Sequence, residues 1–99
     1  MNNLPIFIKL QDEKCLVVGG GMVATRKIKQ LLNAGAKIFV VAIKIKASLK
    51  EAHKLGKIHC QEEKYSEKHL EGKRIVIAAT NDKKLNNKIA EQAKSKNIF

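Results

Sequence analysis

A run of three glycines between an apolar segment and a helical pattern is the feature that most constrains this chain. The stretch CLVVGGGMVATRK covers residues 15–27, and Gly19, Gly21 and Ala24 have the spacing G-x-G-x-x-[G/A]. In that pattern the first glycine forms a sharp turn, the second lets a diphosphate approach the main chain, and the small third residue lets the helix pack on the strand. We therefore predict that a dinucleotide binds here, with its diphosphate at a helix N-terminus. A tight structural turn that binds nothing is the alternative.

Short apolar runs alternate with helical patterns along the chain, which is typical of βα units in a parallel sheet. The runs expected to form strands are residues 15–18, 37–42, 58–61 and 74–79. The segments expected to form helices are residues 22–33, 47–55 and 83–96, with a single helical turn at 66–70. The predicted fold class is α/β, a Rossmann-like doubly wound, mostly parallel sheet.

The two ends of the chain also have strand-like patterns. Residues 6–10 are expected to form a lead-in strand or extended arm, and residues 97–99 have the pattern of a fifth strand that is only beginning. The sheet is therefore expected to be truncated at the start of that strand. We expect residues 1–99 to form one NAD(P)-binding domain, because a second core would need more buried surface than this length provides.

The chain is strongly basic, with 20 Lys and Arg against 9 Asp and Glu and a formal net charge of +11. This balance favours anionic partners such as nucleotides or polycarboxylates. Stacking platforms for single-stranded bases are scarce, with three Phe, one Tyr and no Trp, so nucleic acid is not the expected partner. No stretch approaches the ~18 apolar residues of a membrane span, and no signal peptide is recognised. We predict a cytoplasmic location without a membrane partner.

The end of the second predicted strand departs from the usual dinucleotide pattern. An acidic residue that binds the ribose hydroxyls is expected there, about 20 residues after the glycines. Residues 42–45 read Ala-Ile-Lys-Ile instead. Main-chain groups would then hold the ribose, and Lys44 or Lys46 is compatible with a 2′-phosphate. From the residues alone, NAD and NADP both stay open.

The segment AATND, residues 78–82, follows the fourth predicted strand and opens a helix. Small Ala79 and polar Thr80 would let the nicotinamide side of a dinucleotide pass, while Asn81 or Asp82 caps the helix. Capping without any ligand is the alternative explanation for Asn81 and Asp82. The three histidines of the chain lack the spacing of metal ligands on one helix, so no metal site is expected.

Three longer segments make the chain recognisable. They are LPIFIKL, CLVVGGGMVATRKIKQLLNAGAKIFVVA and RIVIAATNDKKLNNKIAEQAKSKNIF. Together they resemble the siroheme synthase N-terminal domain, the precorrin-2 dehydrogenase family, over essentially the whole chain. The most specific parts are LP.F..L, VVGGG.VA.RK...LL.AGA and IAAT.D..LN. The resemblance implies an enzyme that oxidises precorrin-2 to sirohydrochlorin with NAD, hydride passing to the nicotinamide. In some members iron insertion, a ferrochelatase activity, then gives siroheme.

The resemblance also implies site residues. Its cofactor contacts fall on Gly19, Gly20, Gly21, Met22, Val23, Ile43, Lys44, Ala79 and Thr80. At the second strand's end the family often has a proline and an acid, as in VAPE, where residues 42–44 are Ala-Ile-Lys. The family's catalytic aspartate is expected beyond Phe99, so no catalytic residue is assigned. The resemblance further implies an acidic tetrapyrrole substrate and a homodimer for the full-length protein.

A binding module is the alternative to an enzyme. The same fold also serves as a non-catalytic, dinucleotide-sensing regulatory domain that gates a partner, and fold does not fix function. An aspartate soon after the fifth strand would favour the enzyme. Fusion to a channel or transporter would favour the sensor.

Overall fold

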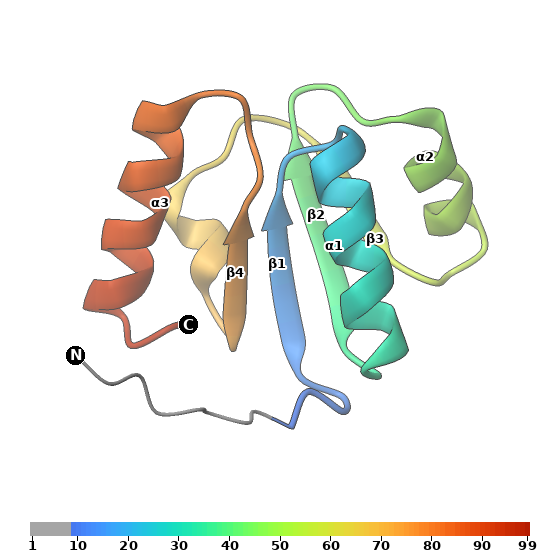
Figure 1. Ribbon diagram of the computed structural model, residues 1–99, viewed down its shortest axis with the longest axis horizontal. Helices are drawn as coiled ribbons and strands as arrows, with labels where there is room; N and C mark the ends of the chain where they lie inside the picture. Colours follow the sequence, from blue (N-terminus) through green and yellow to red (C-terminus); the bar gives the residue numbers. More distant parts are fainter. Residues whose placement is uncertain (1–8) are drawn as a thin grey trace.

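The computed structural model describes residues 9–99. Its strands are β1 (Lys14–Val18), β2 (Lys37–Ala42), β3 (His59–Glu62) and β4 (Ile75–Ala78). Its helices are α1 (Met22–Asn33), α2 (Ala47–Lys54), the short 3-10 helix η1 (Glu67–Leu70) and α3 (Lys83–Ser95). The strands form one sheet in the order β3-β2-β1-β4, and every neighbouring pair is parallel (Figure 1). The predicted α/β fold with a Rossmann-like parallel sheet is confirmed.

Strand β1 lies inside the sheet and pairs with β2 on one side and β4 on the other. Leu16, for example, is in register with both Phe39 and Val76. Apolar residues fill Cys15–Val18 without interruption, and all of them are buried. A strand covered on both faces needs this composition, because neither face meets water.

Helices cover both faces of the sheet, as a doubly wound fold requires. On one face, α1 and α2 pack against Val17 and Val40 through residues such as Ile28. On the other face, α3 and η1 contribute Ile89 and Leu70 to a second cluster. These two clusters form the core and hold the strands in place.

The strand order produces a crevice at one edge of the sheet. From β1 the chain crosses to β2 and then β3 on one side, and it returns to β4 on the opposite side of β1 (Figure 1). The loops that leave β1 and β4 therefore diverge at the carboxyl ends of these strands. In open parallel sheets ligands bind at this reversal of strand order.

The predicted strands differ from the structure in detail. Strand β1 begins one residue earlier than predicted, and β4 is one residue shorter at each end. Strand β3 begins one residue later than predicted, because Ile58 is buried against the core without pairing in the sheet. At the C-terminus no strand is formed, yet Val76 N–H donates to Phe99 O at 2.8 Å and Phe99 N–H donates to Arg74 O at 3.2 Å. This is the hydrogen-bond pattern of a parallel neighbour on the outer edge of β4. In the predicted lead-in strand, residues 6–8 lie outside the described residues, and Lys9 and Leu10 have no regular structure.

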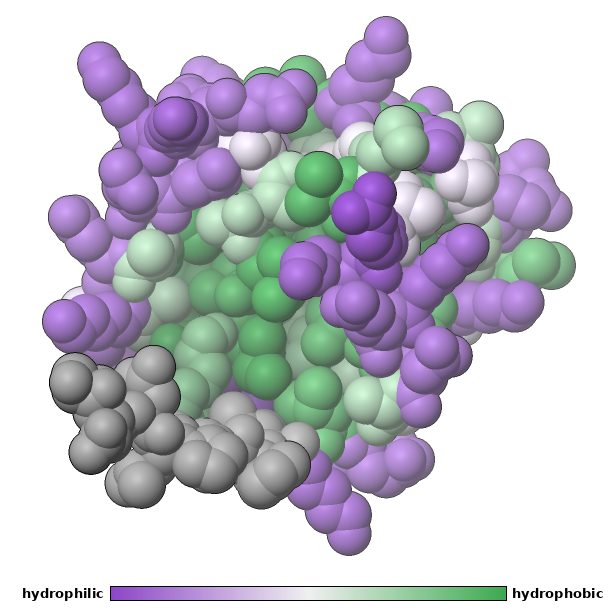
Figure 2. Space-filling view, in the orientation of Figure 1, coloured by the Kyte–Doolittle hydropathy of each residue, from purple (hydrophilic) through white to green (hydrophobic). Residues whose placement is uncertain are grey.

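The face seen in Figure 2 is hydrophilic along its outline and has an apolar area between α3 and α1. Ile75 and Ile77 of β4 are only partly buried. Within residues 9–99, no helix has the length and apolar character needed to span a bilayer.

We expect Ile89→Ala to destabilise the fold by about 2–5 kcal/mol, because the truncation leaves a cavity in the core under α3. Ile89 is fully buried, whereas Leu55 is 63% exposed just after α2. The matched control Leu55→Ala is expected to change the free energy of unfolding by less than about 0.5 kcal/mol. Urea denaturation of both variants is the measurement. Equal effects would contradict the described packing of α3.

Candidate functional site

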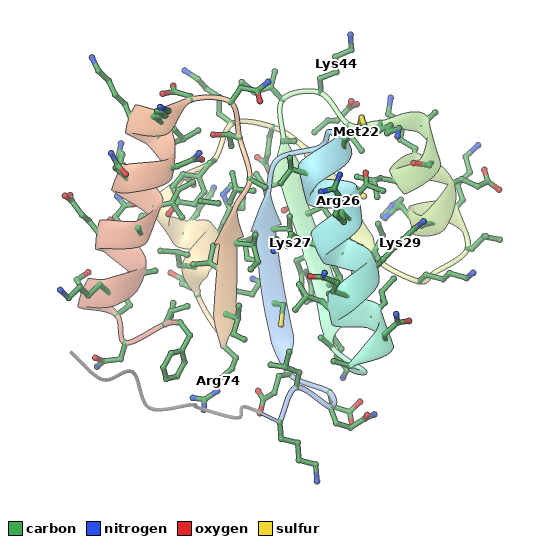
Figure 3. All side chains as sticks on the ribbon, in the orientation of Figure 1. Met22, Arg26, Lys27, Lys29, Lys44 and Arg74 are labelled. Carbon is green, nitrogen blue, oxygen red and sulfur yellow. The ribbon has the colours of Figure 1, made fainter. Side chains whose placement is uncertain are left out.

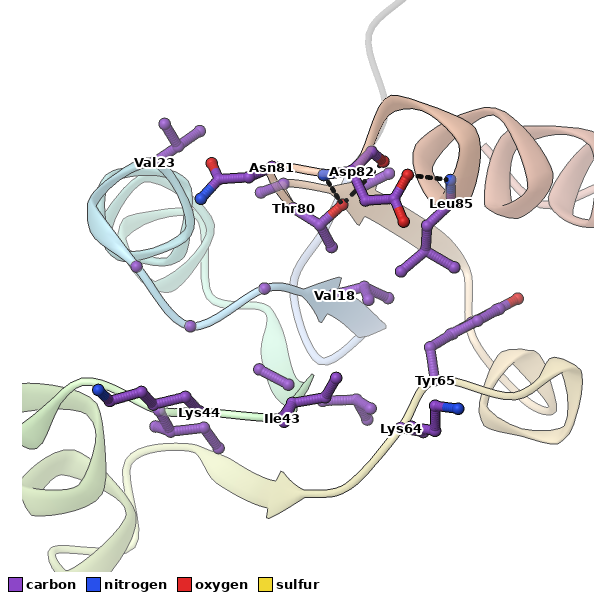
Figure 4. A pocket seen from close by; sticks show the side chains of 18 of the residues that line it. Val18, Val23, Ile43, Lys44, Lys64, Tyr65, Thr80, Asn81, Asp82 and Leu85 are labelled. Carbon is purple, nitrogen blue, oxygen red and sulfur yellow. Dashed lines mark hydrogen bonds between the residues drawn. The ribbon is translucent and has the colours of Figure 1, made fainter.

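A groove lies at the carboxyl ends of β1, β2 and β4, where the strand order reverses. Its volume is about 1050 Å³, at the upper end of the roughly 300–1,000 Å³ typical of ligand pockets. Three connections form its walls: the β1–α1 turn at 19–21, the β2–α2 loop at 43–46, and the β4–α3 loop at 79–82 (Figure 4).

The groove brings together all of the residues predicted from the sequence. These are Gly19, Gly20, Gly21, Met22, Val23, Ile43, Lys44, Ala79 and Thr80. It also contains Lys64 and Tyr65, from the segment between β3 and η1, which the sequence reasoning missed. No motif marks that segment, because its place in the site depends on how the chain returns across the sheet.

Gly19 and Gly20 must be glycines because main chain of the protein itself fills the space that a side chain would need. Gly19 has φ +131, and a Cβ there would overlap the carbonyl oxygen of Ala79. A Cβ on Gly20 would overlap the carbonyl oxygen of Lys44. The glycine turn is therefore held tightly between the two neighbouring loops, and side chains are excluded by backbone.

Gly21 differs from the two glycines before it. Apart from Gly21 itself and its two chain neighbours, no described residue has an atom within 4 Å of the position that its Cβ would take. It is the N-cap of α1, whose start has no side-chain cap among the described residues and no acid in the first turn. The first intrahelical bond runs from Thr25 N–H to Gly21 O at 3.0 Å. Main-chain N–H groups of the first turn consequently lack intrahelical acceptors, and the partial positive charge of the helix end is uncompensated.

Main-chain hydrogen bonds tie the three walls together. Gly19 N–H donates to Val41 O at 2.9 Å, and Ala79 N–H donates to Val18 O at 2.8 Å. Lys46 N–H donates to Gly20 O at 3.0 Å. The relative placement of the glycine turn and both loops is thus set by backbone rather than by mobile side chains.

Asn86 and Asp82 order the β4–α3 loop. Asn86 Nδ2 donates to Thr80 O at 3.0 Å, and Thr80 N–H donates to Asn86 Oδ1 at 3.3 Å. Asp82 caps α3, accepting from Lys84 N–H at 3.0 Å and Leu85 N–H at 3.2 Å. The predicted capping role is confirmed for Asp82.

Tyr65 closes one side of the groove. Its hydroxyl donates to Gln92 Oε1 of α3 at 2.7 Å. Burial, and secondarily the nearby Glu67 carboxylate, raises the pKa of Tyr65, which keeps the phenol neutral. Tyr65 therefore provides a neutral aromatic wall linked to α3.

Glu62, at the end of β3, anchors the β2–α2 loop from outside the groove. Its carboxylate accepts from Ile45 N–H at 3.1 Å, although the two residues are 17 positions apart, and it lies 3.4 Å from Lys50 Nζ. The Ile45 hydrogen bond, helped by Lys50, lowers the pKa of Glu62. The ionised carboxylate thus holds the loop in its observed place.

The residues present fit a dinucleotide. Gly21 leaves room for a diphosphate beside N–H groups that have no intrahelical acceptor, at the positive end of α1. Small Ala79 lies across the groove on the β4 side, and the end of β2 borders the opposite side. A dinucleotide in a fold of this type extends across the glycine turn in this direction.

Comparisons with known proteins agree with this geometry. The NAD_binding_7 family model, which describes an NAD(P)-binding domain, matches residues 6–99. The chain belongs to this NAD(P)-binding family.

Two curated relatives and one solved structure are similar to this chain. The chain is 45% identical over its whole length to siroheme synthase from Psychromonas ingrahamii and 41% identical to that from Nitrosococcus oceani, and it spans 21% of the length of each. A solved structure of SirC, precorrin-2 dehydrogenase, matches with a TM-score of 0.79 and 35% identity, over 90% of this chain and 44% of that one. The predicted resemblance to the siroheme synthase N-terminal domain is confirmed.

We expect Gly20→Ala to destabilise the fold by about 1–3 kcal/mol, because the added methyl meets the Lys44 carbonyl within packed backbone. Gly21→Ala should change stability by no more than about 1 kcal/mol, the effect of a poorer N-cap in open space. Urea denaturation of the two variants gives the comparison. Should Gly21→Ala prove the more damaging, the described surroundings of the turn would be wrong.

We expect the ionised Glu62 carboxylate to make stability depend on pH. Because its folded pKa lies below the ordinary value of 4.5, its contribution is full above that value and is lost as pH falls through the folded pKa. Glu62→Gln should therefore lose less stability than wild type between about pH 6 and pH 3.

Glu51→Gln controls for the removal of one negative charge, because Glu51 is an exposed residue of α2 with no ion pair within residues 9–99. Thermal melts at several pH values in this range should show a weaker dependence of the melting temperature on pH for Glu62→Gln than for Glu51→Gln. If the melting temperatures of the two variants depended on pH in the same way, the ionised Glu62 carboxylate would not stabilise the fold through its contact with the β2–α2 loop.

Proposed function

We propose that this chain is the NAD-binding part of a precorrin-2 dehydrogenase, which oxidises precorrin-2 to sirohydrochlorin in siroheme biosynthesis. The observation that carries the proposal is the open Gly21 position at the bare N-terminus of α1, in a groove of an NAD(P)-binding family member. The names of its relatives and of its structural neighbour support the specific reaction.

Different residues of the groove contact different parts of NAD. Gly21 and the first-turn N–H groups of α1 bind the diphosphate, and Met22 and Val23 border it. Ala79 and Thr80 border the nicotinamide side, where Asn86 and Asp82 keep the loop ordered. Ile43 and Lys44 border the adenosine side. NAD, when bound, would supply the hydride acceptor for this oxidation.

The substrate and the assembly follow from the resemblance and from charge. Precorrin-2 carries many carboxylates, and a chain with a net charge of +11 attracts such an anion. We infer that residues 1–99 act as one NAD(P)-binding domain and that the catalytic aspartate follows Phe99. A homodimer, a ferrochelatase step in the full-length protein and a cytoplasmic location stay predictions.

A non-catalytic sensor domain is not favoured. The relatives named above carry the names of biosynthetic enzymes. Both a dehydrogenase and a sensor need a glycine turn that admits a diphosphate. The choice of a dehydrogenase over a sensor therefore depends on those relatives.

We expect the 99-residue chain to bind NAD in calorimetry and to melt at a higher temperature in its presence, as any ligand of the native state requires. Gly21→Val should weaken binding by at least about tenfold because its side chain occupies the space beside the main chain. The poorer N-cap should lower the melting temperature of the free protein by no more than about 8 °C, so the variant stays folded. Lys57→Ala, on the surface outside the groove, should bind as wild type does.

Absence of binding at about 1 mM NAD or NADH would overturn the proposed cofactor site. The dehydrogenase reaction itself is measured as NADH formation from precorrin-2 and NAD by the protein that carries this domain together with the region following Phe99. If that protein bound NAD but formed no NADH from precorrin-2, the result would favour a non-catalytic sensor over a dehydrogenase.

A further inference from the structure

We propose that the side-chain carboxamide of Asn81 binds the hydroxyls of the nicotinamide ribose of the bound dinucleotide. The inference rests on the proposed function, because it names a further contact in the same groove. Its basis is the hydrogen bonding of the β4–α3 loop. That bonding engages the side chains of Thr80 and Asp82 and leaves the side chain of Asn81 without a partner within residues 9–99.

The lining of the groove includes three neutral polar side chains, those of Tyr65, Thr80 and Asn81. A ribose hydroxyl both donates and accepts hydrogen bonds, so an uncharged group that can do the same is a suitable partner. The hydroxyl proton of Tyr65 is already donated to Gln92 Oε1 at 2.7 Å. Tyr65 therefore has no proton left for a ligand, and Thr80 and Asn81 are the remaining candidates.

The hydroxyl of Thr80 orders the loop itself. Its oxygen accepts from Asp82 N–H at 3.2 Å, and its proton is donated to Asn86 Oδ1. The main chain of Thr80 is engaged as well, since its N–H donates to Asn86 Oδ1 and its carbonyl accepts from Asn86 Nδ2. A hydroxyl has a single proton to donate, so Thr80 borders the groove without a free donor.

Asn81 does not cap α3. Asp82 is the N-cap, and its carboxylate accepts from the N–H groups of Lys84 and Leu85. Asn81 lines the groove, is exposed, and makes no side-chain hydrogen bond to another residue in the described part of the chain. Its carboxamide therefore keeps two N–H donors and one carbonyl acceptor for a ligand.

The side chain of Asn81 is directed toward the start of α1. Figure 4 shows it extending from the β4–α3 loop toward Val23. Figure 3 shows Met22 at the same helix start, at the carboxyl end of the sheet. Met22 and Val23 are 69% and 56% exposed, and their side chains carry no hydrogen-bond donor. A ribose between a diphosphate at Gly21 and the β4 side of the groove therefore meets the Asn81 carboxamide.

Calorimetric titration of the 99-residue chain with ADP, ADP-ribose and NAD tests the inference. ADP ends at the diphosphate, ADP-ribose adds the second ribose, and NAD adds the nicotinamide. We expect Asn81→Ala to raise the dissociation constants of NAD and ADP-ribose by about fivefold or more, because two hydrogen bonds are lost. The constant for ADP should change by less than about twofold. Asn81→Leu keeps the side-chain volume without its polar atoms and should show the same pattern.

The melting temperature of the free protein separates the roles of Thr80 and Asn81. Thr80→Val removes the hydroxyl that bonds to Asn86 and Asp82, so the melting temperature should fall by about 5 °C or more. Asn81→Ala should leave it within about 3 °C, because the residue is exposed and its φ is not positive. Asn87→Ala is the matched control, an exposed asparagine of α3 outside the groove that should leave all three constants unchanged.

An Asn81→Ala variant that binds NAD as tightly as wild type would overturn this inference and leave the proposed function intact. A loss confined to NAD, with ADP-ribose bound as before, would also contradict it, because the contact would then lie on the nicotinamide ring. If Thr80→Val weakened NAD binding without lowering the melting temperature, the Thr80 hydroxyl would face the ligand and the inference would fail. Binding of neither NAD nor ADP by the wild-type chain would overturn the proposed function itself.

Discussion

The close approach of three pieces of main chain at the top of the sheet is the constraint on which the rest of the structure depends. Gly19 meets the Ala79 carbonyl, and Gly20 meets the Lys44 carbonyl. Each contact is closer than a side chain would permit, so the two neighbouring loops are positioned by the turn between them. The groove exists because this packing leaves Gly21, the next residue, facing open space.

Much of the fold could be predicted because its signals are local. The bounds of α1 agree with the predicted helix 22–33, since an uninterrupted helical pattern begins at the glycine turn and a stop signal follows. The four parallel strands followed from apolar runs that alternate with helices. Strand β3 was shifted by one residue because hydrophobicity reports burial, and Ile58 is buried without being paired.

The candidate site could be predicted less completely, because part of it depends on contacts between distant residues. A spacing motif assigns roles to Gly19 and Gly21. Gly20, in contrast, must be a glycine because of the carbonyl group of Lys44, which lies 24 positions later in the chain. Tyr65 enters the groove from a segment without a recognisable pattern, and its bond to Gln92 becomes evident only in three dimensions. Local sequence patterns contain no information on such long-range partners.

The double attachment of the β2–α2 loop has an evolutionary consequence. Main-chain bonds to Gly20 and to the Glu62 carboxylate hold the loop regardless of which side chains it carries at its exposed positions. Replacements at those positions can accumulate without remodelling the scaffold beneath them. Side chains at the exposed positions of this loop can therefore be exchanged while its main chain keeps the same course.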